Sequence, residues 1–128
     1  MKILNNLCDV SKNPKAVTIG NFDGVHKGHQ ALINKTKEVS TKHNVESLIF
    51  TFNKLPKEIF SPDTVQRLYD SKIKESILSS YKVDTLLSID FNEIKDYSAD
   101  FFCEEILIKK LNAQYLIIGE NFKFGKDR

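Results

Sequence analysis

The chain has 128 residues, of which 41% are hydrophobic and 28% charged, a composition typical of one soluble globular domain and unlike that of a disordered or membrane-spanning chain. Its 19 basic and 17 acidic residues give a net charge of +2 and are dispersed along the sequence, so no nucleic-acid partner is expected. The N-terminus turns polar too soon for a signal peptide, and no apolar run reaches membrane-spanning length, which predicts a cytoplasmic protein.

Four short apolar runs, rich in β-branched and aromatic residues, predict β-strands. The expected strands are residues 16–19, 47–52, 85–89 and 115–118. Gly20 and Gly119 follow the first and the last of these runs, which indicates that both strands open into turns.

Helical patterns separate the strands. The first helix is expected over residues 27–42 with a stop at Asn44, and the residues at helical spacing are Ala31, Leu32, Lys35 and Val39. The second is expected over residues 64–81, with an apolar face formed by Leu68, Ile73, Ile77 and Leu78. Ser98 is expected to cap a third helix that continues to about Leu111.

The alternation of strands and helices predicts an α/β fold, in which helices cover both faces of a parallel, doubly wound sheet. In such sheets, ligands bind outside the carboxyl ends of the strands, where the strand order reverses. Residues 20–29 and 119–125 each follow a strand directly and combine glycines with aromatic residues. Both segments are therefore expected at the ligand-binding edge of a single domain.

The segment Gly20-Asn21-Phe22-Asp23-Gly24-Val25-His26-Lys27-Gly28-His29 carries the clearest chemical signal. His26 and His29 are three residues apart, so both imidazoles lie on one side of a helix that begins near Val25. The first turn of a helix offers free N–H groups and the positive end of the helix dipole to a phosphate. Gly28 lets a nucleotide approach the backbone. The segment predicts an ATP site for adenylyl transfer, in which the histidines neutralise charge on the reacting phosphates.

Other interpretations of these residues are structural. An isolated histidine at a helix start can be a surface residue, and phenylalanines at strand ends are more often core residues. A zinc site is disfavoured because the two histidines lack a third ligand at suitable spacing. Cys8 and Cys103 are far apart in the sequence, which indicates reduced thiols and no metal site of the protein's own.

The segment from Gly20 to His29 resembles the nucleotide motif of the bacterial bifunctional riboflavin kinase/FAD synthetase family, in its FMN adenylyltransferase module. Residues 119–125, Gly-Glu-Asn-Phe-Lys-Phe-Gly, are similar to the family's loop Gly-x-Asp/Asn-Phe-x-Phe-Gly. The residues that resemble the family's flavin segment Thr-Phe-x-Pro-His-Pro-x-x-x-Phe are Thr51, Phe52, Pro56 and Phe60. The resemblance extends over residues 16–128.

The resemblance implies a Rossmann-like nucleotidyltransferase fold and the transfer of AMP from Mg²⁺-bound ATP to FMN, which gives FAD and pyrophosphate. The implied catalytic residues are His26 and His29. The residues implied to bind ATP are Gly20, Phe22, Asp23, Gly24, Gly28 and Asn121. Those implied to line the flavin pocket are Phe52, Pro56, Phe60 and Phe124.

Two features depart from the family pattern. Lys54 and Leu55 stand where the family has its first proline and its histidine. The chain also stops at Arg128, before the family's Ser-Ser-Thr-x-x-Arg motif and its riboflavin kinase barrel. We therefore expect residues 1–128 to form an incomplete FMN adenylyltransferase domain without a kinase domain, with an exposed sheet edge and weak activity in isolation.

Two further functions fit the same residues. The first is adenylyl transfer to another phosphorylated acceptor, such as nicotinate mononucleotide or phosphopantetheine. The second is a non-catalytic module that binds a nucleotide or a flavin. The sequence does not indicate an oligomeric state.

Overall fold

The computed structural model describes residues 1–22, 27–53 and 72–119. In this part of the chain, five parallel strands form one sheet in the order β1-β4-β3-β2-β5. The strands are β1 (Lys2–Leu4), β2 (Lys15–Ile19), β3 (Glu46–Asn53), β4 (Thr85–Asp90) and β5 (Ala113–Ile117). The four predicted strands are confirmed, each with ends within one or two residues of those expected.

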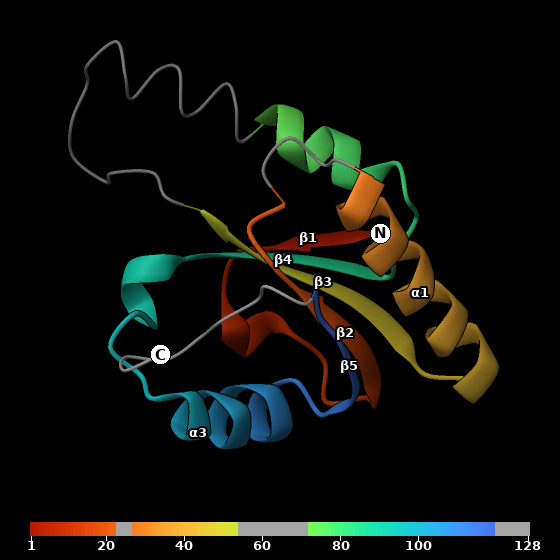
Figure 1. Cartoon of the computed structure of the whole chain (residues 1–128). Helices are drawn as coiled ribbons and strands as arrows, with labels where there is room; N and C mark the ends of the chain where they lie inside the picture. The colour runs from red at the N-terminus through yellow and green to blue at the C-terminus, as the bar shows by residue number, and fades with distance from the viewer. Residues whose placement is uncertain (23–26, 54–71, 120–128) are drawn as a thin grey trace, which may run out of the picture.

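Helices cover both faces of the sheet, which confirms the predicted α/β class. Helix α1 (Lys27–His43) and a helix over residues 72–79 lie on one face (Figure 1). On the other face, α3 (Ala99–Phe101) continues directly into a π-helix, η3 (Phe102–Lys110) (Figure 1). Short 3₁₀ turns, η1 (Leu7–Asp9) and η2 (Phe91–Glu93), follow β1 and β4.

Strand β1 does not figure among the sequence-based expectations. It forms an edge of the described sheet by pairing with β4, with Ile3 opposite Leu86, and the amide of Lys2 donates to the carbonyl oxygen of Asp84. Three residues are too few to show a periodic pattern. This strand is therefore recognised by its pairing with β4 and not by its composition.

The core has two parts, one on each side of the sheet, because successive strand residues point to opposite faces. Val17, Leu48 and Phe50 pack toward η3, together with Phe102 and other residues of that helix. The second cluster, beneath α1 and the helix over residues 72–79, consists of Phe22, Ile33, Ile49, Leu78, Val83 and Leu86. The central strands are therefore buried on both sides, as expected for a parallel sheet.

The ends of the helices agree with the predicted caps. Asn44 has a φ of 54°, the left-handed conformation that ends α1, and the Ser98 hydroxyl accepts a hydrogen bond from the amide of Phe101. Along the helix over residues 72–79, Leu78 is buried but Ile73 and Ile77 are 42% and 39% exposed. The predicted apolar face of this helix is therefore wrong in its described part.

The buried face of α1 also differs from the predicted one. The residues expected at helical spacing are exposed or half-buried, namely Ala31, Leu32, Lys35 and Val39. The buried residues are Ile33, Thr36 and Ser40. Two of these are polar, but their hydroxyls donate to the carbonyl oxygens of Leu32 and Val45. Hydrogen bonding to the backbone lets hydroxyl residues face a core that an apolar pattern does not reveal.

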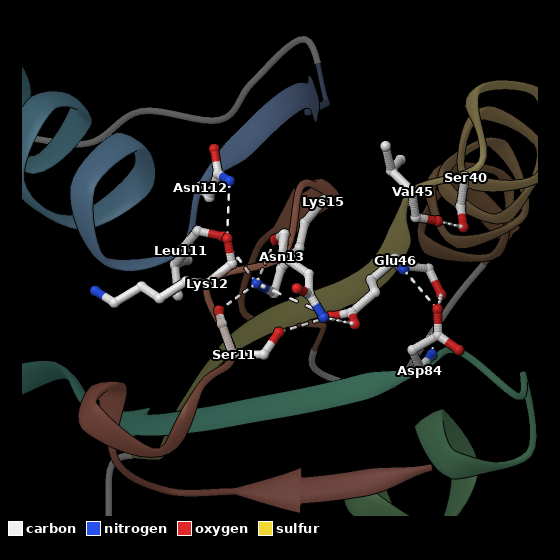
Figure 2. A network of polar contacts seen from close by, with 11 residues as sticks. Ser11, Lys12, Asn13, Lys15, Ser40, Val45, Glu46, Asp84, Leu111 and Asn112 are labelled. Carbon is white, nitrogen blue, oxygen red and sulfur yellow. Dashed lines mark hydrogen bonds and ion pairs between the residues drawn. The ribbon is translucent and has the colours of Figure 1, made fainter.

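A polar network joins the amino ends of β2 and β3 to the end of η3 (Figure 2). Its centre is Lys15, which is fully buried and donates from Nζ to the carbonyl oxygens of Ser11, Asn13 and Leu111. The carboxylate of Glu46 lies 4.0 Å from the same ammonium. This network lies at the edge of the sheet opposite the carboxyl ends of the strands, so it supports the fold and not a site at those ends.

Candidate functional site

The strand order reverses between β2 and β5, because β2 pairs with β3 on one side and with β5 on the other. Thr18 is opposite Ile117 in this pairing, so the two strands end close together. The segments that begin at Gly20 and Gly119 thus leave neighbouring strands at the same edge. A Cβ atom on Gly119 would lie 3.6 Å from Cδ1 of Leu32, which places Gly119 against α1. Such a reversal is where ligands bind in doubly wound sheets.

The first residues after β2, from Gly20 to Phe22, are held in place by three neighbouring features. The amide of Gly20 donates to the carbonyl oxygen of Phe50 at 3.1 Å, which extends the β2–β3 pairing by one hydrogen bond. Phe22 has a φ of 54° and a fully buried side chain. A Cβ atom on Gly20 would lie only 3.2 Å from Cε2 of Phe22. The glycine therefore makes room for the phenylalanine ring, and the ring anchors the loop in the core.

Phe22 also contacts His29, in the first turn of α1. Their ring centroids are 5.1 Å apart with an interplanar angle of 62°, an edge-to-face arrangement. The Nδ1 atom of His29 is buried, while the residue as a whole is half-buried. The structure thus brings together Gly20, Phe22 and His29, three of the predicted site residues, with Phe22 as the support on which the imidazole rests.

The start of α1 has the electrostatic character of an anion site. Its first turn contains no acidic residue, whereas Lys42 and His43 lie in its last turn. Lys27 and Gly28, both exposed, occupy the first two positions. The positive end of a helix dipole favours phosphate, and no carboxylate in this turn opposes it.

Phe52, predicted to bind flavin, lies on the other face of the sheet from Phe22. Its side chain is 5% exposed and packs edge-on against Phe91, with ring centroids 5.3 Å apart. Phe52 also contacts Phe50 in the cluster that packs toward η3. The described residues therefore place Phe52 in the core at the end of β3, and they do not bring it to Phe22 and His29.

Seven predicted site residues lie outside the described part of the chain. They are Asp23, Gly24, His26, Pro56, Phe60, Asn121 and Phe124. The predicted roles of these residues remain predictions from the sequence.

Sequence reasoning missed Lys74, which lies on the helix over residues 72–79. Its ammonium donates to the carbonyl oxygens of Asn21 at 2.9 Å and Phe52 at 3.1 Å. The hydroxyl of Thr51 donates to the same Asn21 oxygen at 3.0 Å. The available signal was the position of Lys74, one helical turn before the buried Leu78 and so on the inner face of the helix.

Within residues 1–22, 27–53 and 72–119, no group of three histidine, cysteine or acidic side chains is placed to hold a metal ion. Cys8 and Cys103 are exposed free thiols, as the sequence predicts. A search of the same residues finds no helix long and apolar enough to cross a membrane.

Comparison with known proteins gives one consistent family. The family model of FAD synthetase matches residues 8–128. A bifunctional riboflavin kinase/FMN adenylyltransferase of Buchnera aphidicola subsp. Schizaphis graminum is 39% identical over 127 residues, which cover 98% of this chain and 40% of the relative. The protein of the same name from Escherichia coli K12 is 33% identical over 133 residues, covering 100% of this chain and 42% of the relative. The chain thus spans about two fifths of the length of the curated relatives it matches.

Among solved structures, the chain resembles one titled as a macrolide-efflux protein from Streptococcus pneumoniae. The TM-score is 0.69 at 28% sequence identity, and the match covers 98% of this chain and 42% of the other. This likeness agrees with the Rossmann-like arrangement of the sheet and its helices.

Proposed function

The chain belongs to the FAD synthetase family, and from this premise we propose that it transfers AMP from ATP to the phosphate of FMN, releasing pyrophosphate and forming FAD. The observation that carries the proposal is the match of the FAD synthetase model to residues 8–128. The geometry supports it, because His29 and the start of α1 lie beside the point where the strand order reverses. The proposal gives this chain the FMN adenylyltransferase activity of the bifunctional relatives and does not include their riboflavin kinase activity.

The reaction moves a phosphoryl centre between two oxygen atoms, so the protein mainly has to align the phosphates and stabilise the charge that develops on them. We assign this stabilisation to His29 and His26, which donate hydrogen bonds to the ATP phosphates. Gly20, Phe22, Asp23, Gly24, Gly28 and Asn121 are proposed to form the ATP site. Within this set, the buried ring of Phe22 holds the imidazole of His29 while the phosphates bind at the start of α1.

Magnesium enters the proposal with ATP, as part of the substrate. The described residues fit this role, since the start of α1 offers N–H groups and an imidazole to the phosphates and has no carboxylate in its first turn to bind a cation. We assign the flavin to Pro56, Phe60 and Phe124 and to the carboxyl end of β3 at Phe52, whose ring itself is buried in the core. A cytoplasmic location and the lack of a nucleic-acid partner remain predictions from the sequence.

The direct test is to incubate the purified chain with FMN and ATP labelled on its α-phosphate, and to measure labelled FAD by chromatography and pyrophosphate by a coupled assay. We expect FAD and pyrophosphate in equal amounts. His29→Ala is expected to lower the rate by about tenfold to a few hundredfold, since it removes a charge-assisted hydrogen bond. His43→Ala, at the opposite end of α1, is the matched control and should keep the rate.

Two alternatives have distinct outcomes in the same experiment. Nicotinate mononucleotide or phosphopantetheine that accepts label better than FMN would identify a different acceptor. ATP and FMN binding without pyrophosphate release, unchanged by His29→Ala, would identify a non-catalytic binding module. Either result would contradict FAD synthesis by this chain.

A further inference from the structure

Strands β2 and β3 separate at their carboxyl ends, and Lys74 lies at this point. The pairing of the two strands ends with Ile19 opposite Phe50 and with the hydrogen bond from the Gly20 amide to the Phe50 oxygen. Beyond this hydrogen bond, β3 continues to Asn53, whereas the segment that follows β2 turns away at Phe22. We call this divergence the fork.

The fork leaves backbone oxygens without a strand partner. In a strand, the carbonyl groups of residues i and i+2 point the same way, so Phe52 O faces the side on which Phe50 O binds the Gly20 amide. No further β2 amide follows there. The ammonium of Lys74 takes this place, since it donates to Phe52 O at 3.1 Å.

The same ammonium also holds the other side of the fork. It donates to Asn21 O at 2.9 Å and lies 3.4 Å from the hydroxyl oxygen of Thr51. Thr51 is buried, and its hydroxyl donates to Asn21 O. One cation thus bridges two segments that are about thirty residues apart, and it offsets the negative partial charge of their oxygens at an edge proposed to receive phosphates.

We infer that Lys74 is a positioning residue, which sets the ATP loop of Gly20 to Phe22 against the flavin segment that begins at Thr51 and Phe52. This inference rests on the proposed function of the two segments. Lys74 acts through the backbone of both, so removal of its ammonium weakens ATP and FMN binding together. A residue that served one ligand alone would affect one affinity alone.

The test compares Lys74→Met with Lys72→Met in the full chain. Methionine keeps the length of the side chain and removes the ammonium. Lys72 is the matched control because it lies on the same helix, is 80% exposed and pairs with Glu75 on the surface. ATP affinity is measured by calorimetry and FMN affinity by flavin fluorescence. Hydrogen exchange of the peptide that contains Gly20 is measured without ligands.

We expect Lys74→Met to lower both affinities by about tenfold, the effect of losing hydrogen bonds to a charged group, and to speed exchange at Gly20. Lys72→Met should leave all three measurements unchanged. A second variant guards against a simple loss of folding: Lys74→Cys, made with Cys8→Ser and Cys103→Ser, is alkylated with bromoethylamine, which restores an ammonium at nearly the same distance. Both affinities should then recover.

Each contrary result has its own meaning. If the unaltered chain binds ATP and FMN and Lys74→Met binds both equally well, the inference is wrong and the proposed function stands. A loss of affinity for only one of the two ligands would also overturn the inference, because Lys74 would then not act on both binding segments. If the unaltered chain binds neither ligand, the proposed function fails and the positioning role fails with it. Faster hydrogen exchange at Gly20 in Lys74→Met would then show that Lys74 stabilises the fold only.

Discussion

The ammonium of Lys15 donates to the carbonyl oxygen of Leu111 at 3.0 Å, which ties the first residue of β2 to the end of η3. Lys15 is fully buried, and this burial lowers the pKa of its ammonium, while the nearby carboxylate of Glu46 acts in the opposite direction. A buried charge is tolerated only where hydrogen bonds replace its lost hydration. The carbonyl oxygens of Ser11, Asn13 and Leu111 supply three such bonds.

Lys15→Met is therefore expected to destabilise the protein by about 3 kcal/mol, because it leaves buried carbonyl oxygens without a donor. Urea unfolding followed by circular dichroism measures this loss. Lys12→Met is the matched control: Lys12 is exposed and its ammonium donates to one carbonyl oxygen, that of Lys109. Its expected cost is below about 0.5 kcal/mol. Equal effects of the two substitutions would contradict the role given to Lys15.

Glu46 gives the network a pH dependence. The hydrogen bond from Asn13 lowers the pKa of Glu46 below its ordinary value of 4.5, with further contributions from the hydroxyl of Ser11 and the charge of Lys15, against the effect of burial. A carboxyl group whose pKa is lower in the folded state stabilises the protein above its ordinary pKa. That stabilisation disappears as the pH falls from 4.5 through the lowered value.

We expect Glu46→Gln to lose less stability than the unaltered protein over this acidic range, because the amide has no charge to lose. The measurement is the free energy of unfolding in urea as a function of pH. Glu38→Gln changes a carboxylate that is 68% exposed and serves as the control, with a curve that should follow the unaltered protein. Parallel curves for the unaltered protein and Glu46→Gln would show that Glu46 does not carry this dependence.

Thr18, the fourth residue of β2, offers a prediction of the opposite sign. It is fully buried, and its hydroxyl forms no hydrogen bond within the described chain. A buried hydroxyl without a partner costs about 1–3 kcal/mol, so Thr18→Val should raise the free energy of unfolding by about 1 kcal/mol. Thr36 is equally buried but donates to Leu32, and Thr36→Val should bring no gain. The measurement is thermal unfolding of both variants. A loss of stability in Thr18→Val would contradict the absence of a hydrogen bond at the Thr18 hydroxyl.

The sequence predicts those parts of the fold that depend on neighbours along the chain. The run from Ala16 to Ile19 ends at a glycine, and Ser98 caps α3, so strand and helix ends follow local patterns. The alternation of these elements then indicates a parallel sheet and the edge at which residues 20–29 begin. These patterns predict Gly20 and His29 at the same edge of the sheet, and in the structure both contact Phe22.

Residues that act over long sequence separations escape such patterns. Lys15 binds an oxygen 96 residues away, and Lys74 binds one 53 residues away. Sequence patterning treats a lysine as a surface residue, since an unpaired charge is rarely buried, and the carbonyl groups that satisfy these two become neighbours only in the folded chain. Thr36 was missed for a related reason, because its hydroxyl is satisfied by the backbone of its own helix.

The packing of Gly20 against Phe22 leads to a last prediction, which joins the fold to the proposed site. A Cβ atom on Gly20 would lie 3.2 Å from the buried ring of Phe22, which cannot move into solvent to avoid it. Gly20→Ala is therefore expected to cost about 1–2 kcal/mol of stability and to displace the ring that supports His29. Gly119→Ala is the control, because its Cβ atom would make an ordinary contact of 3.6 Å with Leu32.

A double-mutant cycle with Phe22→Leu separates this contact from other effects of the alanine. The smaller leucine costs core packing by itself but leaves room for a Cβ atom at Gly20. The double variant should therefore be more stable than the sum of the two single losses predicts, by about 1 kcal/mol. ATP affinity, measured on the same proteins, should fall in Gly20→Ala. Additive losses of stability would mean that Gly20 is required for a reason other than the ring of Phe22.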